Sequence, residues 1–118
     1  MRVQIQGQEV RFRVDEAELA TLLDGREVVN NTWFGPHAGV VQRLGTYAAA
    51  VPSFEAMHDQ WHLLLPESAL RAHAGRLPCK DGLMFELERG GGLAMTIRFD
   101  VDVRDSARMR RRSRTHPA

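Results

Sequence analysis

Cysteine and long apolar runs are the features that this sequence of 118 residues has least of. Cys79 is the only cysteine, so an internal disulfide is excluded and a cytoplasmic protein is the simplest interpretation. No run of about eighteen apolar residues is present, which excludes a membrane-spanning helix. Residues 1–14 alternate apolar and polar side chains, and therefore lack the continuous apolar stretch of a signal peptide.

The composition is that of a globular domain. Hydrophobic residues make up 43% and charged residues 26% of the chain, which is too apolar for a wholly disordered protein. A chain of this length has room for one core and not for two. We therefore expect a single domain over residues 1–104.

The formal net charge of +1 is unevenly distributed. Residues 105–118 contain five arginines and one acid, whereas residues 1–104 contain 11 basic and 14 acidic residues. The C-terminal segment has too few apolar side chains to offset the entropy lost on ordering, so we expect a disordered basic tail. Its arginines are candidates for contacting nucleic acid or another anionic surface, and a merely solvated end is the alternative. They are Arg108, Arg110, Arg111, Arg112 and Arg114.

Alternation of apolar and polar residues predicts seven strands. They cover residues 3–5, 10–14, 27–34, 40–51, 61–65, 83–87 and 93–103. Two short helices are also predicted. Asp15 and Glu18 form a capping-box pattern before the first helix, which ends at Gly25. Pro66 opens the second helix and Gly75 closes it.

Two stretches of the chain align at a constant offset of 51 residues, residues 10–19 and residues 61–70. Each is a strand followed by a helix, and each leads through Gly-Arg into two further strands joined by a glycine-containing turn. A single β-α-β-β unit cannot bury its apolar face alone, so we expect two copies that share a core. The expected fold is α+β, an antiparallel sheet or small barrel of about seven strands with two short helices. Coincidental patterning is the alternative to duplication.

The opening segment Arg2-Val-Gln-Ile-Gln-Gly7 leads into Val10-Arg-Phe-Arg-Val14, and the Gly25 stop, the Phe34-Gly35 turn and the Leu65-Pro66 helix start follow. This arrangement resembles a family of short bacterial proteins that open with a pattern like lysine-isoleucine-arginine-isoleucine-x-glycine. The function of that family is unknown. The resemblance therefore implies a single bacterial domain and carries over no catalytic residue.

In the second half, Leu63-Leu-Leu-Pro66 and Leu70-Arg71 precede Gly75 and the glycine run at residues 90–92. This order of strand, proline, short helix, glycine and hairpin is similar to the swapped-hairpin barrel of AbrB-type transcription regulators. The sequence departs from that pattern at residues 76–82, where a longer loop replaces a tight turn. The resemblance implies a DNA-binding regulator as an alternative function, by analogy of shape alone.

Three arginines project from the polar side of the first predicted hairpin. Arg2 is expected opposite Arg13, and like charges that face each other destabilise a hairpin. A negative group should therefore lie nearby. Arg2, Arg11 and Arg13 are candidates for binding a phosphate or carboxylate, which guanidinium groups recognise through paired hydrogen bonds. In the alternative interpretation, Asp100 and Asp102 on the outward face of the last strand neutralise them.

The sequence shows no pattern for a metal site, a cofactor or a catalytic nucleophile. His58 and His62 have i, i+4 spacing, but they fall in a turn and a strand, so their rings are not expected to converge on a metal. His73 is expected at the surface of the second helix or lightly packed there. The glycine run at residues 90–92 lacks the lysine of a phosphate-binding loop and indicates a hairpin turn. Cys79 has no local signature of a catalytic thiol.

These patterns favour a small, non-enzymatic binding or interaction domain that contacts anionic partners through the hairpin and tail arginines. We expect a homo-oligomer formed through a sheet edge, with nucleic acid or protein as a further partner. The alternatives are a nucleic-acid-binding regulator of AbrB-like shape and an enzyme whose site lies between the two repeats. No cofactor is implied.

Overall fold

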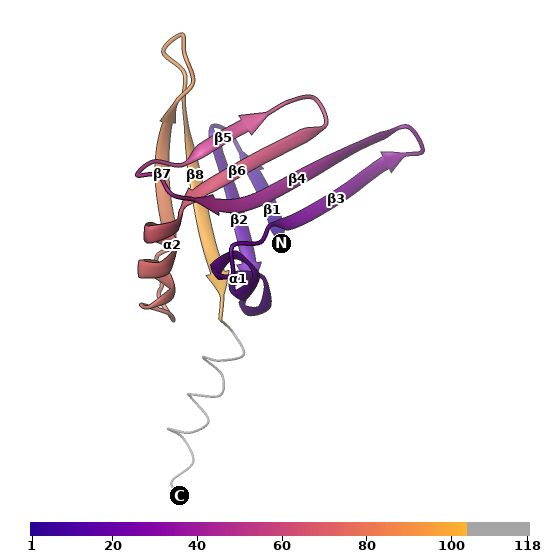
Figure 1. Ribbon diagram of the computed structural model, residues 1–118. Coiled ribbons are helices and arrows are strands. Elements are labelled where there is room, and N and C mark those ends of the chain that lie inside the picture. Colours follow the sequence, from indigo (N-terminus) through magenta and orange to yellow (C-terminus); the bar gives the residue numbers. More distant parts are fainter. Residues whose placement is uncertain (104–118) are drawn as a thin grey trace, which may run out of the picture.

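The computed structural model describes residues 1–103, which form a mixed α+β domain (Figure 1). Eight strands and two helices are present, and the strands form two four-stranded sheets. The expected basic tail, residues 105–118 with its five arginines, lies outside the described residues.

The first sheet, sheet A, brings the beginning of the chain together with its last strands. Its members are β1 (Arg2–Gln6), β2 (Glu9–Asp15), β7 (Leu83–Glu88) and β8 (Ala94–Asp102), in the order β1-β2-β8-β7. The central pair, β2 and β8, is parallel, and each of these strands has an antiparallel hairpin partner on its other side. Two hairpins from distant parts of the chain therefore lie side by side in one layer.

The second sheet, sheet B, comes from the middle of the chain. Its members are β3 (Val28–Gly35), β4 (Ala38–Tyr47), β5 (Ser53–Ala56) and β6 (Gln60–Pro66), in the order β3-β4-β6-β5. Here too the central pair, β4 and β6, is parallel and the outer pairs are antiparallel. The strands of the two sheets cross each other in Figure 1.

Three features of the sheets correct the sequence-based expectation. The count is eight strands rather than about seven, because β5 is only four residues long and its pattern is too short to stand out. Each sheet contains a central parallel pair, whereas antiparallel neighbours were expected throughout. Neither sheet closes into a barrel, since each has two edge strands that pair on one side only within residues 1–103.

The first helix, α1 (Glu16–Leu23), begins directly where β2 ends, and its predicted capping box is confirmed. The N–H of Glu18 donates to Asp15 Oδ1 at 2.7 Å, and the N–H of Asp15 donates to Glu18 Oε1 at 3.0 Å. Gly25 has a φ of 80°, the left-handed conformation that ends a helix at low cost for glycine. The helix thus begins at the predicted capping box and ends before the predicted glycine stop.

The second helix, α2 (Glu67–Ala74), follows β6 in the same way. Gly75 is its C-cap, as the sequence predicts, whereas Pro66 is its N-cap and lies just before the first turn, in which it was expected. In Figure 1 the two helices lie at the same end of the sheets. Neither helix of the described domain has the length and apolarity needed to cross a membrane.

The core lies between the two sheets and the inner sides of the helices. Phe12, Leu63 and Phe99, which come from different parts of the chain, are all fully buried in it. The rings of Phe12 and Phe54 meet edge to face, with 6.3 Å between their centroids, and Trp61 packs on Phe54 in the same manner at 6.1 Å. Because apolar side chains fill this layer, charged groups are left to the outer faces and rims.

Candidate functional site

The outer face of sheet A carries a group of four arginines, named here the arginine cluster: Arg2, Arg11, Arg13 and Arg98. Successive residues of a strand point to opposite sides, so Arg11 and Arg13 lie opposite the buried side of β2. In the parallel pair, Arg11 lies beside Arg98 on β8, and Arg13 lies beside Asp100. On the other side Arg13 faces Arg2 on β1, as the sequence predicts.

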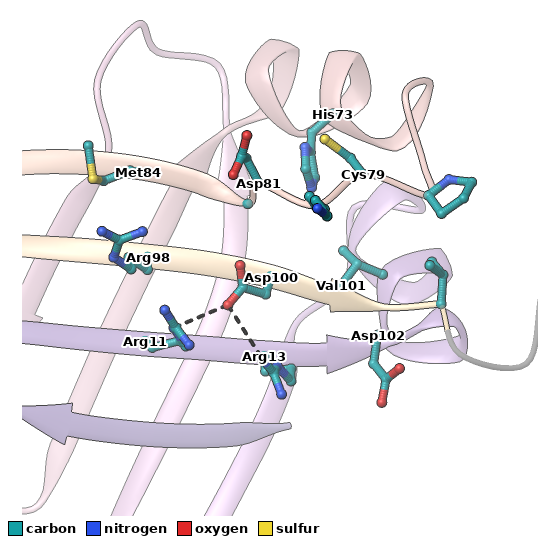
Figure 2. Close-up of a pocket in the computed structure, with 14 residues that line it drawn as sticks. Arg11, Arg13, His73, Cys79, Asp81, Met84, Arg98, Asp100, Val101 and Asp102 are labelled. Carbon is teal, nitrogen blue, oxygen red and sulfur yellow. Dashed lines mark ion pairs between the residues drawn. The ribbon is translucent and has the colours of Figure 1, made fainter. Parts of the chain in front are cut away.

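Asp100 is the acidic group at the centre of the cluster (Figure 2). Its Oδ2 atom lies 3.2 Å from Nε of Arg11 and 3.9 Å from Nη2 of Arg13. Two cations thus share one carboxylate. This agrees with the alternative interpretation of the sequence, in which Asp100 neutralises the hairpin arginines. The buried Nε atom of Arg11 has no hydrogen-bond partner within residues 1–103, because its contact with Asp100 is close without being well aligned. The cluster therefore retains both positive charge and an unused donor.

The position of Asp100 depends on a glycine on the neighbouring segment. A Cβ atom on Gly82 would overlap Oδ1 of Asp100 and the carbonyl oxygen of Phe99. Only a residue without a side chain lets the segment that enters β7 pass so close to β8. Gly82 thereby leaves the Asp100 carboxylate its place beside the two arginines.

A depression of about 950 Å³ opens over this part of the sheet. Strands β2 and β8 contribute to it, together with the loop between α2 and β7 (Figure 2). Its charged lining consists of four cations and three acids: Arg11, Arg13, Arg98, Lys80, Asp81, Asp100 and Asp102. Arg98 and Lys80 were not among the site residues predicted from the sequence. Alternation along the last strand does place Arg98 on its polar side. No local sequence pattern indicates that Lys80 lies close to Arg98.

The other two members of the arginine cluster differ in their partners. Nε of Arg98 lies 2.5 Å from Oε1 of Glu9, so this cation has its own carboxylate. Arg2 is exposed, does not line the depression, and has no ion-pair partner within residues 1–103. Of the three predicted anion-binding residues, the structure thus places Arg11 and Arg13 in the depression and Arg2 beside it.

His73 lines the same depression and corrects an expectation. It was expected at the surface or lightly packed, but it is only 1% exposed, and its ring meets Phe99 edge to face at 6.5 Å. Burial lowers the pKa of His73, Arg76 lowers it further, and Asp100 acts in the opposite direction. The imidazole is therefore neutral at pH 7. The burial of His73 could have been predicted from the offset of 51 residues, because this offset aligns His73 with Leu22, which is equally buried.

The remaining candidates from the sequence lie elsewhere or add no reacting group. His58 is exposed before β6, whereas Nε2 of His62 lies 3.1 Å from Oε1 of Glu27 on sheet B. Cys79 is exposed on the rim of the depression. In the part of the chain that the structure describes, no three His, Cys, Asp or Glu side chains gather in a way that could hold a metal.

The depression therefore offers charge and hydrogen-bond donors. Arginine stays protonated at all physiological pH values and presents five N–H donors in a planar fork, which matches the oxygens of phosphate and carboxylate groups. Comparisons with protein-family models, with curated proteins and with solved structures found no match for this chain.

Proposed function

We propose that this chain is a binding domain for a phosphate-bearing partner, which docks on the outer face of sheet A. The observation that carries the proposal is the sharing of the Asp100 carboxylate by Arg11 and Arg13, at 3.2 Å and 3.9 Å. One negative charge orients the two guanidinium groups without neutralising both. A phosphate oxygen can add negative charge and accept hydrogen bonds from the partly exposed guanidinium groups of Arg11 and Arg13.

We also infer that the two halves of the chain are copies of one unit, which is longer by one strand than the β-α-β-β pattern read from the sequence. A shift of 51 residues carries β2 onto β6 and α1 onto α2. The strand registers support this inference, because Phe12 lies opposite Phe99 in sheet A while its counterpart Leu63 lies opposite Leu44 in sheet B. Each half is then two hairpins with a helix between them.

This duplication provides an internal comparison for the arginine cluster. The positions of sheet B that correspond to Arg11, Arg13 and Asp100 are, in that order, His62, Leu64 and Gly45. Sheet B thus folds with a leucine beside a glycine where sheet A has an arginine beside an aspartate. Since the same scaffold does not need this charged pair, we attribute the pair to binding rather than to folding.

The arginines that follow the described domain in the sequence favour a nucleic acid over a small phosphate. Val103, the last described residue, lines the depression. The chain then continues into residues 105–118 with their five arginines. Cations on the sheet and on the attached segment together suit a partner with many phosphates, because each neutralised phosphate releases counterions and adds to the affinity.

Binding of a fluorescently labelled DNA duplex of about 20 base pairs, followed by anisotropy, tests the proposal. If the four lining cations each neutralise one phosphate, affinity falls about 100-fold between about 50 mM and about 200 mM salt. Arg11→Gln and Arg13→Gln should each weaken binding by up to about tenfold at low salt and lower the salt slope by about one unit. Asp100→Asn removes the competing carboxylate and should strengthen binding.

The matched control is Arg43→Gln, which removes a cation from the outer face of sheet B, where its Nη1 lies 3.3 Å from Glu27. This variant should bind DNA as the native chain does. Two results together would contradict a site on sheet A. In the first, Arg11→Gln and Arg13→Gln both bind DNA as the native chain does; in the second, deletion of residues 105–118 abolishes binding. Absence of binding even at low salt would refute the choice of nucleic acid, and titration with inorganic phosphate would then show whether the depression takes phosphate alone.

A further inference from the structure

Strand β3 is the one edge strand in residues 1–103 without a protecting device. Edge strands expose unpaired N–H and C=O groups, and proteins usually blunt them with charges, with proline or by keeping them very short. The other three edges follow this rule: β1 carries Arg2, β5 has only four residues and carries Glu55, and β7 carries Glu86 and Glu88. The unpaired side of β3 is open to another strand.

β3 is also uncharged, and several of its exposed side chains are apolar. Its eight residues, Val-Val-Asn-Asn-Thr-Trp-Phe-Gly, include no charge and no proline. Val29, Trp33 and Phe34 are exposed by 43%, 71% and 74%. In Figure 1 the β3–β4 hairpin extends beyond the rest of the domain.

The exposed indole of Trp33 is held against its own hairpin. Its cross-strand partner is Gly39, and a Cβ atom there would come within 2.9 Å of Cε3 of the ring. The missing side chain of Gly39 lets the ring lie close to β4. An aromatic side chain fixed in this way loses little conformational entropy when a partner covers it.

We propose that β3 pairs antiparallel with β3 of a second copy of the chain, about a two-fold axis at Asn31. In this register Val29 lies opposite the partner subunit's Trp33, and Asn31 lies opposite the partner's Asn31. These alternate residues share one face of the strand, opposite the buried Val28. The paired segment stays within the regular part of β3, because the irregularity in its pairing with β4 comes after Trp33.

The surface is self-complementary, which favours a second copy as the occupant. No like charges meet, because β3 carries none. An axis between Asn30 and Asn31 would set Trp33 against Val28, which is only 7% exposed and already covered by the core. The axis at Asn31 instead covers an exposed valine with an exposed indole at two symmetric places, the type of cross-strand pair that stabilises sheets.

The exposed apolar area of the paired segment fits a small interface. An aromatic side chain buries about 150–250 Å² when fully covered. At the observed exposures, the two copies of Trp33 offer about 300 Å², to which Val29 and the strand backbones add. This places the dimer in the class of small interfaces, below about 1,200 Å², that hold weak complexes. The dimer would join the two copies of sheet B into one continuous sheet and leave both arginine clusters on sheet A free.

Sedimentation of the full chain tests this inference, which does not depend on the proposed function. Under reducing conditions, which keep the exposed Cys79 from cross-linking, the native chain should sediment at twice its monomer mass at about 100 μM. Asn31→Lys and Asn31→Asp should each raise the dissociation constant at least about tenfold, because two like charges then face each other across the axis. An equimolar mixture of the two variants should restore the dimer, because lysine then faces aspartate.

Glu86→Lys is the matched control, because it changes the charge of an exposed residue on the edge strand of the other sheet. It should dimerise as the native chain does, and circular dichroism should show that every variant is folded. A native chain that stays monomeric at about 100 μM overturns the proposal. So do Asn31 variants that dimerise as tightly as the native chain, and so does a mixture that remains monomeric.

Discussion

Replacing His73 with leucine tests how the inner wall of the depression is built. The imidazole is 1% exposed and packs against the ring of Phe99. Burial lowers its pKa, Arg76 on the following loop acts in the same direction, and Asp100 on β8 acts in the opposite one. The unfolded chain therefore takes up a proton at this histidine more readily than the folded chain. Acid should favour unfolding through this one residue.

The pH window follows from the direction of the shift. Well above pH 6.5, the ordinary pKa of histidine, His73 is neutral in both states and its burial stabilises the fold fully. As the pH falls through that value, only the unfolded state becomes protonated. The free energy of unfolding then decreases by at most about 1.4 kcal/mol per pH unit until the pH reaches the lowered pKa of the folded state. His73→Leu removes this dependence and introduces the side chain that α1 buries at Leu22, the position aligned with His73 by the proposed duplication.

Urea unfolding at about pH 7 and about pH 5, followed by circular dichroism, measures the effect. The native chain should lose more stability than His73→Leu between these pH values, and the variant should be the more stable of the two at the lower pH. The control is His58→Leu, which replaces an exposed histidine and should keep the native pH dependence. Equal losses of stability in the native chain and in His73→Leu would refute the reasoning.

Three further substitutions test the fold and the site. Gly82→Ala should lower the free energy of unfolding by about 1–3 kcal/mol in urea titrations, because the added methyl group overlaps Asp100 and a backbone carbonyl that cannot move aside. Asp15→Ala should cost about 1 kcal/mol in thermal unfolding, because it removes the N-cap of α1. Phe12→Ala should cost about 3–5 kcal/mol, because the fully buried ring leaves a cavity between the sheets. A loss below about 1 kcal/mol for Phe12→Ala would contradict its central place in the core.

The sequence predicted what depends on near neighbours or on polarity alone. Asp15 and Glu18 lie three residues apart and contain the whole signal for the start of α1. Strict alternation along β2 and β8 separated the buried phenylalanines from the charged residues, so Arg11, Arg13 and Asp100 were expected on the polar sides of their strands. These inferences need no knowledge of which strands lie side by side.

Contacts between distant strands were beyond such reasoning. Alternation shows which side of a strand is buried, but it does not show which strand lies next to it. The parallel pairing of β2 with β8 places Arg98 beside Arg11, and the loop before β7 adds Lys80 to the same depression. His73 was misjudged for a related reason: small alanine neighbours suggest an exposed helix, whereas the packing of α2 buries this position.

Sheet A constrains the order in which the chain can fold during its synthesis. Strand β2 leaves the ribosome before any strand of sheet B, yet its parallel neighbour β8 follows all of them. Sheet B consists of consecutive segments and can assemble before then, while the hairpin β1–β2 still has an open edge. Folding is thus expected to proceed from the middle of the chain outward. A nascent chain that stalls before residue 94 would leave one edge of β2 unpaired and open to aggregation, so sheet A depends on translation through β8.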